Sequence, residues 1–343
     1  MARIDLDLAH AYKPNPQRDE DYALLPLKMT FDDGGAYALL GPSGCGKTTL
    51  LNIISGLVKP SQGGVKFDGV DVKDKTPQQR NIAQVFQFPV IYDTMTVAEN
   101  LAFPLKNRGV PAERILQRVG KVAEMLELSA QLDQRAAGLA ADAKQKISLG
   151  RGLVREDVSA VLFDEPLTVI DPHLKWQLRR KLKQIHNELK LTLVYVTHDQ
   201  VEALTFADQV VVMTRGRAVQ IGSASELFER PRHTFVGHFI GSPGMNFLPA
   251  SLLPGAPAGA TKLGVRPEYV TLAVANAAGA LPATVTQAQD IGTYWLLTAT
   301  VGDGAIVRAR LRPDQVIPKV GTTVWLGLVG AHTCFYKDEE LVA

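Results

Sequence analysis

The fold is decided by the stretch Gly41-Pro42-Ser43-Gly44-Cys45-Gly46-Lys47-Thr48. It fits the pattern G-x-x-x-x-G-K-[S/T] of a phosphate-binding loop at every fixed position. The glycines let the backbone curl so that successive N–H groups point at one anion. In this pattern the lysine reaches the β- and γ-phosphates, and the Thr48 hydroxyl binds Mg²⁺. We therefore expect these residues, together with Thr49, to hold the phosphates of a nucleotide.

Both flanks of this loop have the sequence that the motif requires. Residues 36–40 form a continuous apolar run, typical of a buried strand, and residues 50–54 predict an apolar helix. We expect this helix to open near Thr49 and to aim the positive end of its dipole at the phosphates. A chance glycine-rich turn is the alternative, but it explains neither flank.

The bulk composition limits the class of protein. A length of 343 residues suggests about two domains. The net charge of +2 argues against a nucleic-acid partner. Cys45 and Cys334 are too few for a disulfide framework, which indicates a reducing compartment. The first residues show no apolar signal region, and no run approaches about 18 apolar residues, so we expect any membrane role to depend on a partner.

Strand-like and helix-like segments alternate through the first two thirds of the chain. Residues 4–8 alternate apolar and polar side chains, which predicts an edge strand, and residues 13–21 predict a hairpin loop. Residues 94–150 show helical spacing. Continuous apolar runs at 158–163, 191–196 and 209–213 predict buried parallel strands, so the fold class is α/β.

The character of the sequence changes after about residue 238. Residues 249–260 are rich in proline, glycine and alanine. Short alternating runs follow at 294–298, 305–311 and 322–326, separated by turn residues such as those at 302–304. This pattern is typical of a small β-barrel or sandwich.

The run at 160–163 ends in two carboxylates, Asp164 and Glu165. The first can hold Mg²⁺ through water, and the second can orient and polarise the water that attacks a γ-phosphate. A strand that ends in a solvated acidic turn is the alternative. The upstream phosphate-binding loop favours the catalytic interpretation.

The phosphate-binding loop, the carboxylates after an apolar strand, and Val196-Thr197-His198-Asp199 together resemble the ATP-binding subunits of ABC transporters. The resemblance implies an ABC-type nucleotide-binding domain at 1–237, with a helical subdomain at about 90–150. It implies that Gln87 is the Q-loop glutamine, which touches Mg²⁺ and the attacking water. It also implies that His198 contacts the γ-phosphate and that residues 167–171 form the D-loop.

The same resemblance places Tyr12 against the adenine ring, although an inward-packing role for Tyr12, or adenine stacking by Tyr22, remains open. Residues 241–247 and 264–268 resemble the OB-like accessory domain of carbohydrate- and polyol-importer ATPases, closest to those of glycerol-type importers. That domain is expected at 238–343. The implied partners are membrane permease subunits and, indirectly, a periplasmic solute-binding protein. The implied place is the cytoplasmic face of the inner membrane.

One segment departs from the family pattern. Where the family has the signature Leu-Ser-Gly-Gly-Gln, this chain reads Leu139-Ala140-Ala141-Asp142-Ala143. In the family, the serine hydroxyl and glycine N–H groups bind ATP held by the facing subunit. Ala140 lacks the hydroxyl, and Asp142 adds a carboxylate near the γ-phosphate. Asp142 can instead be a helix N-cap, with Gln145 three residues later.

The altered signature favours a heterodimer with a second ABC ATPase subunit, in which this chain supplies Lys47, Glu165 and His198 and the other supplies the signature. Two other functions remain open. One is an ATP-binding regulatory subunit with little hydrolysis. The other is a soluble ABC ATPase of repair or translation, which the single phosphate-binding loop and the lack of a long heptad run disfavour.

Overall fold

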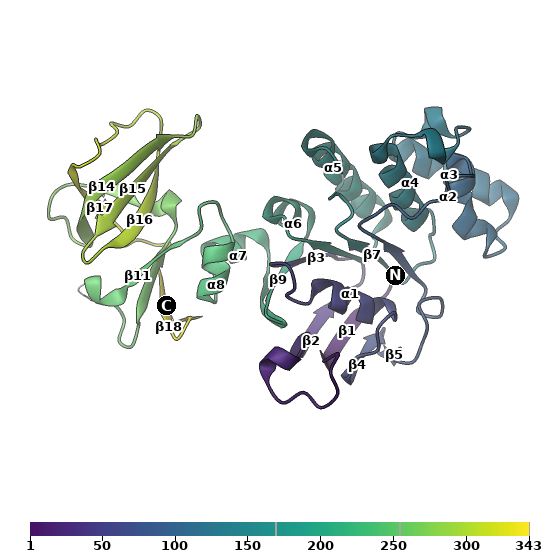
Figure 1. Cartoon of the computed structure of the whole chain (residues 1–343), viewed down its shortest axis with the longest axis horizontal. Coiled ribbons are helices and arrows are strands. Elements are labelled where there is room, and N and C mark those ends of the chain that lie inside the picture. Colours follow the sequence, from purple (N-terminus) through teal and green to yellow (C-terminus); the bar gives the residue numbers. More distant parts are fainter. Residues whose placement is uncertain (169, 254, 343) are drawn as a thin grey trace. The chain divides into compact units, whose positions relative to one another are not determined.

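The computed structural model describes residues 1–168, 170–253 and 255–342. They form two compact units, Met1–Ser223 and Ala224–Ala343 (Figure 1). Residues 224–237, which the sequence interpretation assigns to the nucleotide-binding domain, group with the second unit. Within the described residues, every helix is too short or too polar to cross a membrane.

The centre of the first unit is a six-stranded sheet in the order β10-β9-β3-β8-β7-β6. Strands β9, β3, β8, β7 and β6 are parallel, and β10 is antiparallel to β9. The strand bounds are β3 (Ala36–Leu40), β6 (Ile82–Val85), β7 (Ala160–Asp164), β8 (Leu193–Thr197), β9 (Gln209–Thr214) and β10 (Arg217–Gly222). Strands β3 and β8 are buried along their whole length, as their continuous apolar sequences predict.

A second sheet of the first unit is antiparallel, in the order β2-β1-β4-β5. Its strands are β1 (Ile4–His10), β2 (Leu24–Phe31), β4 (Gln62–Phe67) and β5 (Val70–Asp71). The prediction of an edge strand at residues 4–8 is wrong, because β1 pairs with β2 on one side and with β4 on the other. Alternation reports one buried face and says nothing about whether both edges are paired. The predicted hairpin loop does join β1 to β2.

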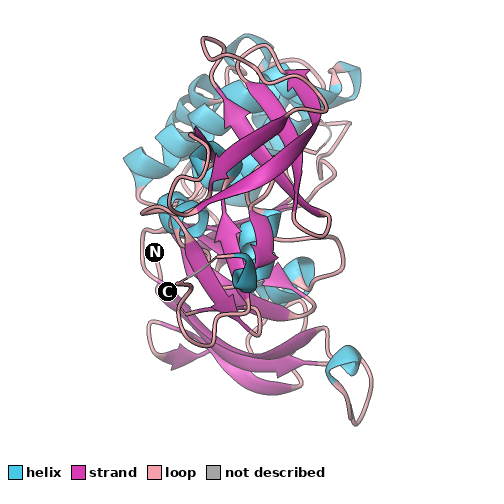
Figure 2. Cartoon of the chain, turned by 90° about the vertical axis from the view of Figure 1, so that its left-hand side faces the viewer, coloured by secondary structure: helices cyan, strands magenta, loops and turns pink. Residues whose placement is uncertain are grey.

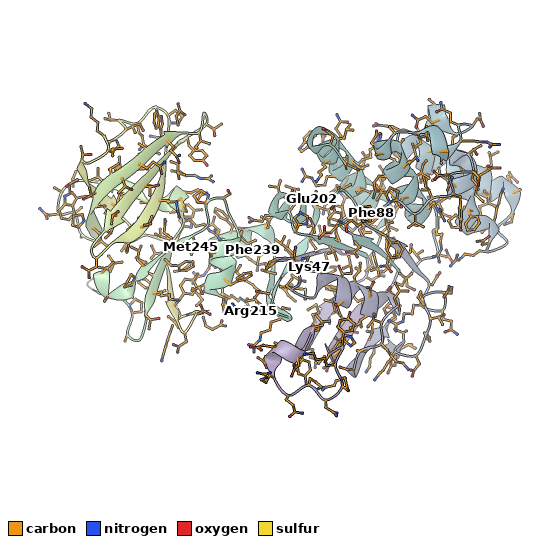
Figure 3. All side chains as sticks on the ribbon, in the orientation of Figure 1. Lys47, Phe88, Glu202, Arg215, Phe239 and Met245 are labelled. Carbon is orange, nitrogen blue, oxygen red and sulfur yellow. The ribbon has the colours of Figure 1, made fainter. Side chains whose placement is uncertain are left out.

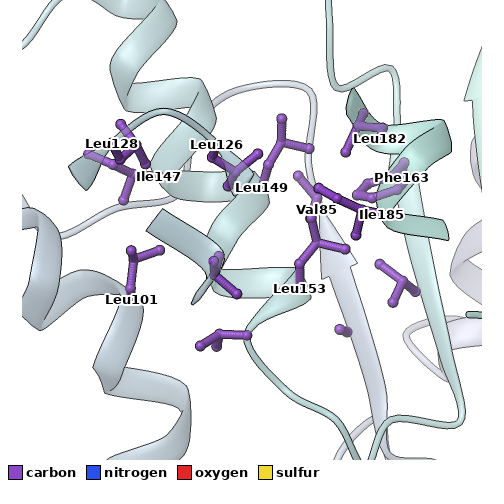
Figure 4. Packing of buried hydrophobic residues seen from close by; sticks show 14 of the residues in the cluster. Val85, Leu101, Leu126, Leu128, Ile147, Leu149, Leu153, Phe163, Leu182 and Ile185 are labelled. Carbon is purple, nitrogen blue, oxygen red and sulfur yellow. The ribbon is translucent and has the colours of Figure 1, made fainter. Parts of the chain in front are cut away.

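Helices cover the six-stranded sheet and form a separate helical group (Figure 1). The helices of the first unit are α1 (Lys47–Ser55), α2 (Val97–Lys106), α3 (Ala112–Met125), α4 (Ala141–Leu153), α5 (Pro172–Leu189) and α6 (Gln200–Phe206), with short 3-10 helices at Asp19–Asp21, Ser129–Gln131 and Ala136–Gly138. One apolar cluster joins the group formed by α2, α3 and α4 to the six-stranded sheet (Figure 4). Leu101, Leu126 and Ile147 come from the helical group, and Val85, Phe163 and Ile185 lie on or against the sheet. A second cluster packs α1 between the two sheets.

The second unit begins with two short helices, α7 (Ala224–Glu229) and α8 (Thr234–Phe239), and continues mainly as strands (Figure 2). One sheet has the order β13-β17-β14-β15-β16 and the other β11-β12-β18-β19. The strands are β11 (Asn246–Pro249), β12 (Lys262–Val265), β13 (Thr271–Ala273), β14 (Ala280–Asp290), β15 (Trp295–Val301), β16 (Ala305–Leu311), β17 (Thr323–Gly327), β18 (Cys334–Lys337) and β19 (Glu340–Leu341), with short 3-10 helices at Ala250–Leu252 and Pro267–Tyr269.

The predicted strands of the second unit are found within a few residues of their expected places. Alternate residues of β14, β15 and β16 point into one apolar core, which includes Val285, Leu297 and Val307. The unit therefore has a hydrophobic core of its own, as an independent domain requires.

Candidate functional site

The phosphate-binding loop lies between β3 and α1, as the motif requires. Gly46, the residue before α1, has φ of 103°, a conformation that side chains disfavour. Gly41 is needed for space, because a Cβ there would lie 2.2 Å from the Met213 carbonyl oxygen on β9. Helix α1 begins at Lys47, slightly earlier than predicted, so its first N–H groups belong to the loop itself.

Lys47 lies along the loop with only 6% of its surface exposed (Figure 3). Its ammonium group donates hydrogen bonds to the carbonyl oxygens of Gly41 at 2.8 Å and Pro42 at 3.0 Å. The Cys45 sulfur is 3.9 Å away. Burial raises the pKa of the Cys45 thiol, and the Lys47 charge opposes that shift, so the thiol is not activated here.

Thr48 and Asp164 meet at the carboxyl end of β7. The Thr48 hydroxyl donates to Asp164 Oδ1 at 3.2 Å. Burial raises the pKa of the Asp164 carboxyl group, the Thr48 hydrogen bond opposes this shift, and the neighbouring Glu165 charge adds to it. A hydroxyl and a poorly solvated carboxylate are the oxygen donors that Mg²⁺ prefers, so these residues fit the ion that the motif implies.

Glu165 and His198 lie on adjacent strand ends. Glu165 Oε2 is 3.1 Å from His198 Nδ1, and Thr168 Oγ1 is 3.3 Å from the same carboxylate oxygen. The Glu165 backbone N–H donates to the Val196 carbonyl, which joins the end of β7 to that of β8. Two side chains predicted to act on the γ-phosphate are therefore already in contact.

Tyr12 and Gln87 are placed differently with respect to this centre. The Tyr12 hydroxyl is 3.2 Å from Thr49 Oγ1, and 65% of the residue is exposed. Its ring makes an edge-to-face contact with the His10 ring, with 4.5 Å between the centroids, and the predicted stacking on adenine stays a prediction. Tyr22 instead accepts a hydrogen bond from Gln62. Gln87 is half-buried between β6 and α2, without a hydrogen bond to the Thr48–Asp164 pair in the described structure. In the predicted D-loop, Val169 lies outside the described residues.

The altered signature segment forms the start of α4. Ala140 is the N-cap and lacks a side-chain hydrogen bond to the helix, and its carbonyl accepts from the Lys144 N–H at 3.0 Å. The alternative prediction that Asp142 is the N-cap is wrong, because the first helical turn already contains Asp142. The two lysines that follow Asp142 on α4 form ion pairs with other carboxylates, Lys144 with Asp93 and Lys146 with Glu127.

Three residues near the centre were not singled out from the sequence as site residues. Thr168 contacts Glu165. The buried Gln145 side chain donates a hydrogen bond to the carbonyl of Pro166, the residue that follows Glu165. Glu202 accepts from the hydroxyls of Tyr195 and Thr197 next to His198. For Glu202 the available signal was a polar residue among the apolar neighbours Val201, Ala203 and Leu204. Gln145 lies between two lysines in the sequence, so nothing there indicated that its side chain is buried.

A phosphate-binding loop follows the parallel strand β3. The Thr48–Asp164 pair, which fits Mg²⁺, and the Glu165–His198 pair lie at the ends of the neighbouring strands. This arrangement defines a P-loop ATPase. The comparisons with known proteins agree with this class. A family model described as ABC transporter matches residues 24–168, and one described as TOBE domain matches residues 263–335.

Two relatives and one solved structure are similar over long stretches. The chain is 40% identical over 323 residues to the sn-glycerol-3-phosphate import ATP-binding protein UgpC of Salmonella typhimurium, covering 88% of this chain and 90% of the relative. It is 46% identical over 252 residues to the trehalose import ATP-binding protein SugC of Mycobacterium tuberculosis, covering 74% of this chain and 63% of the relative. The solved structure is CbiO1 from Clostridium perfringens, part of the ABC transporter complex CbiONQ. It has 26% identity and a TM-score of 0.60, and covers 66% of this chain and 90% of that chain.

The chain therefore belongs to the ATP-binding proteins of ABC transporters. It is an ATPase that uses ATP with Mg²⁺, and its nucleotide-binding fold is followed by a β-rich, OB-like TOBE domain. The fold class and the family resemblance drawn from the sequence are confirmed.

Proposed function

We propose that the chain is the energy-coupling ATPase subunit of an importer for a sugar, a polyol such as glycerol, or a glycerol phosphate. The names of the relatives, a glycerol-3-phosphate importer and a trehalose importer, support the solute class. The observation that supports hydrolysis is the contact of Glu165 with His198 beside the Thr48–Asp164 pair. The subunit would act at the cytoplasmic face of the membrane, bound to permease subunits that a periplasmic binding protein supplies with solute.

In the proposed reaction, water attacks the γ-phosphorus and the bond to the β–γ bridging oxygen breaks, releasing ADP and phosphate. Residues Gly41–Thr49 hold the phosphates, with backbone N–H groups and Lys47 balancing their charge. Glu165 orients and polarises the attacking water, and His198 binds the γ-phosphate oxygens as they gain charge. Mg²⁺, held by Thr48, Asp164 and Gln87, would neutralise negative charge on the β- and γ-phosphates.

The variant Glu165→Gln in the assembled importer tests this role. We expect a kcat at least about 100-fold lower, with MgATP affinity unchanged, because the amide is a poor proton acceptor of similar shape. Solute uptake should fall with the hydrolysis rate. If the chain is instead a regulatory ATP-binding subunit, transport by this variant stays at the wild-type rate.

We propose that a groove beside the Q-loop is the binding site for the permease subunits. It is lined by Phe86, Val90 and Pro104 and by the guanidinium groups of Arg108 and Arg151. Phe88 next to it is 68% exposed (Figure 3). Exposed aromatic residues rimmed by arginine are typical of a protein-binding surface. Helix α2 contributes Pro104 to this groove.

The variant Phe88→Asp tests whether the permease binds at this groove. We expect it to reduce co-purification of the permease subunits with the ATPase while leaving nucleotide binding unchanged. Leu116→Asp is the matched control, because Leu116 on α3 is also highly exposed, at 75%, and lies outside the groove. Equal co-purification of wild type and Phe88→Asp would contradict the placement.

We also propose that the working dimer pairs this chain with a second ABC ATPase subunit. Ala140 and Ala141 are exposed at the start of α4, and neither offers the hydroxyl or the glycine backbone of the family signature. Asp142 adds a negative charge to the turn that would face the γ-phosphate of the other subunit. This chain is therefore a poor donor of a signature, although its own phosphate-binding loop is complete.

ATPase activity of this chain alone, and mixed with a second ATPase subunit encoded beside it, tests the pairing at equal total subunit concentration. Activity that appears only in the mixture is the expected result. Substantial activity of this chain alone would show that the segment 139–143 works as a signature and would overturn the heterodimer proposal.

A further inference from the structure

Glu202 is a buried carboxylate at the start of α6, with 4% of its surface exposed (Figure 3). One of its oxygens, Oε2, accepts hydrogen bonds from the Thr197 hydroxyl at 2.8 Å and the Tyr195 hydroxyl at 3.1 Å. Burying a carboxylate is unfavourable unless such partners are present. The Glu202 carboxylate on α6 is therefore held against the end of β8, at the residue that directly precedes His198 in the chain.

The hydrogen bonds of Glu202 fix the backbone on both sides of His198. Because the Thr197 hydroxyl donates to Glu202, its oxygen faces the Asp199 N–H, which donates to it at 3.0 Å. Asp199 in turn caps α6 by accepting from the Val201 N–H at 2.7 Å. The peptide units before and after His198 are thus held by one connected set of hydrogen bonds.

The His198 side chain itself has little other support. It is 56% exposed, and its contact with Glu165 Oε2 at 3.1 Å is with the other proposed catalytic group. The direction in which the ring points therefore depends mainly on the backbone that carries it. An error of about 1 Å in such a group can lower a rate on the order of 100-fold.

The second oxygen of Glu202 connects this arrangement to α5. Lys175 Nζ lies 3.9 Å from Glu202 Oε1, and the Lys175 backbone N–H donates to the Asp171 carbonyl at the end of the D-loop. Glu202 is therefore in contact with β8, which ends one residue before His198, and with the helix that follows the D-loop.

We propose that Glu202 is a positioning residue for ATP hydrolysis. It holds His198 against Glu165 through Thr197, and it links that position to α5 through Lys175. The inference rests on the proposed roles of His198 and Glu165. It adds that the histidine works only when the buried carboxylate behind it is intact.

The test is a double-mutant cycle in the assembled importer, measuring kcat, KM for ATP and thermal stability. Glu202→Ala and Thr197→Val are each expected to lower kcat on the order of 10- to 100-fold with KM within about twofold of wild type. Thr197→Ser, which keeps the hydroxyl, is expected to restore most of the rate. Glu188→Gln, an exposed carboxylate on α5, is the control and should leave the rate unchanged.

The decisive comparison uses His198→Ala as the background. If Glu202 acts through the histidine, adding Glu202→Ala to His198→Ala lowers single-turnover hydrolysis no further. A further loss as large as that in the wild-type background would overturn the inference, as would a wild-type kcat for Thr197→Val. Thr197→Val retains the carboxylate and keeps the test valid if Glu202→Ala does not fold. A wild-type rate for His198→Ala would instead overturn the proposed role of His198 itself.

Discussion

The Asp164 carboxyl group is harder to ionise in the folded protein than in water, because burial raises its pKa. The folded state therefore binds this proton more tightly than the unfolded state does. Stability from this group is fully present below the unfolded pKa and is lost as the pH rises toward the folded pKa. At neutral pH the ionised group destabilises the nucleotide-free protein, and a bound cation relieves that effect.

Asp164→Asn is expected to raise the melting temperature of the nucleotide-free protein at neutral pH, because the amide carries no charge to desolvate. The same change should reduce the stabilisation by MgATP, which for wild type is about 2.7 kcal/mol at 100 times Kd. Melting curves with and without MgATP, at pH 4 and pH 7.5, measure both effects. The gain should be smaller at pH 4, and a lower melting temperature at pH 7.5 without nucleotide would contradict the argument.

At the scale of the element, the predictions that succeeded depended on local rules. The phosphate-binding loop needs glycines at fixed places, so Gly41 and Gly46 could be assigned from spacing alone. The pairing of β1 on both edges could not be predicted, because its partners are distant in sequence. The start of α4 could not be predicted either, because its N-cap is an alanine, which has no polar side chain. Glu202 was missed although Tyr195 and Thr197 are near it in sequence, because a hydroxyl at a strand end does not reveal its acceptor; the contact with Lys175 depends on α5, which is distant in sequence.

Helix α4 starts at an alanine cap, which leaves its first N–H groups without a side-chain acceptor. Ala140→Ser is expected to stabilise the protein by about 1 kcal/mol, because the hydroxyl accepts from the first turn. Chemical denaturation measures this gain, and Ala137→Ser, an exposed position in the 3-10 helix that precedes α4, is the control. An unchanged free energy of unfolding for Ala140→Ser would mean that water already accepts the hydrogen bonds of the first N–H groups of α4.

At the scale of the whole molecule, each unit has its own apolar core. We expect two unfolding transitions, of which MgATP raises only the one that belongs to the first unit. The three tryptophans allow this to be observed, because Trp176 lies in the first unit and Trp295 and Trp325 lie in the second.

In a Trp176→Phe variant, tryptophan fluorescence reports the second unit alone, and its transition should not move with MgATP. Circular dichroism of the same sample follows both units. A single transition that shifts with MgATP in both signals would show that the units unfold together.

The backbone of Glu165 has a further consequence. Its φ of 47° is in the left-handed region that side chains other than glycine disfavour, at a cost of order 1 kcal/mol or more. The chain thus keeps a strained residue at the end of β7, where glycine would fit without strain. If Glu165 orients the attacking water as proposed above, this strain is stability given up for turnover.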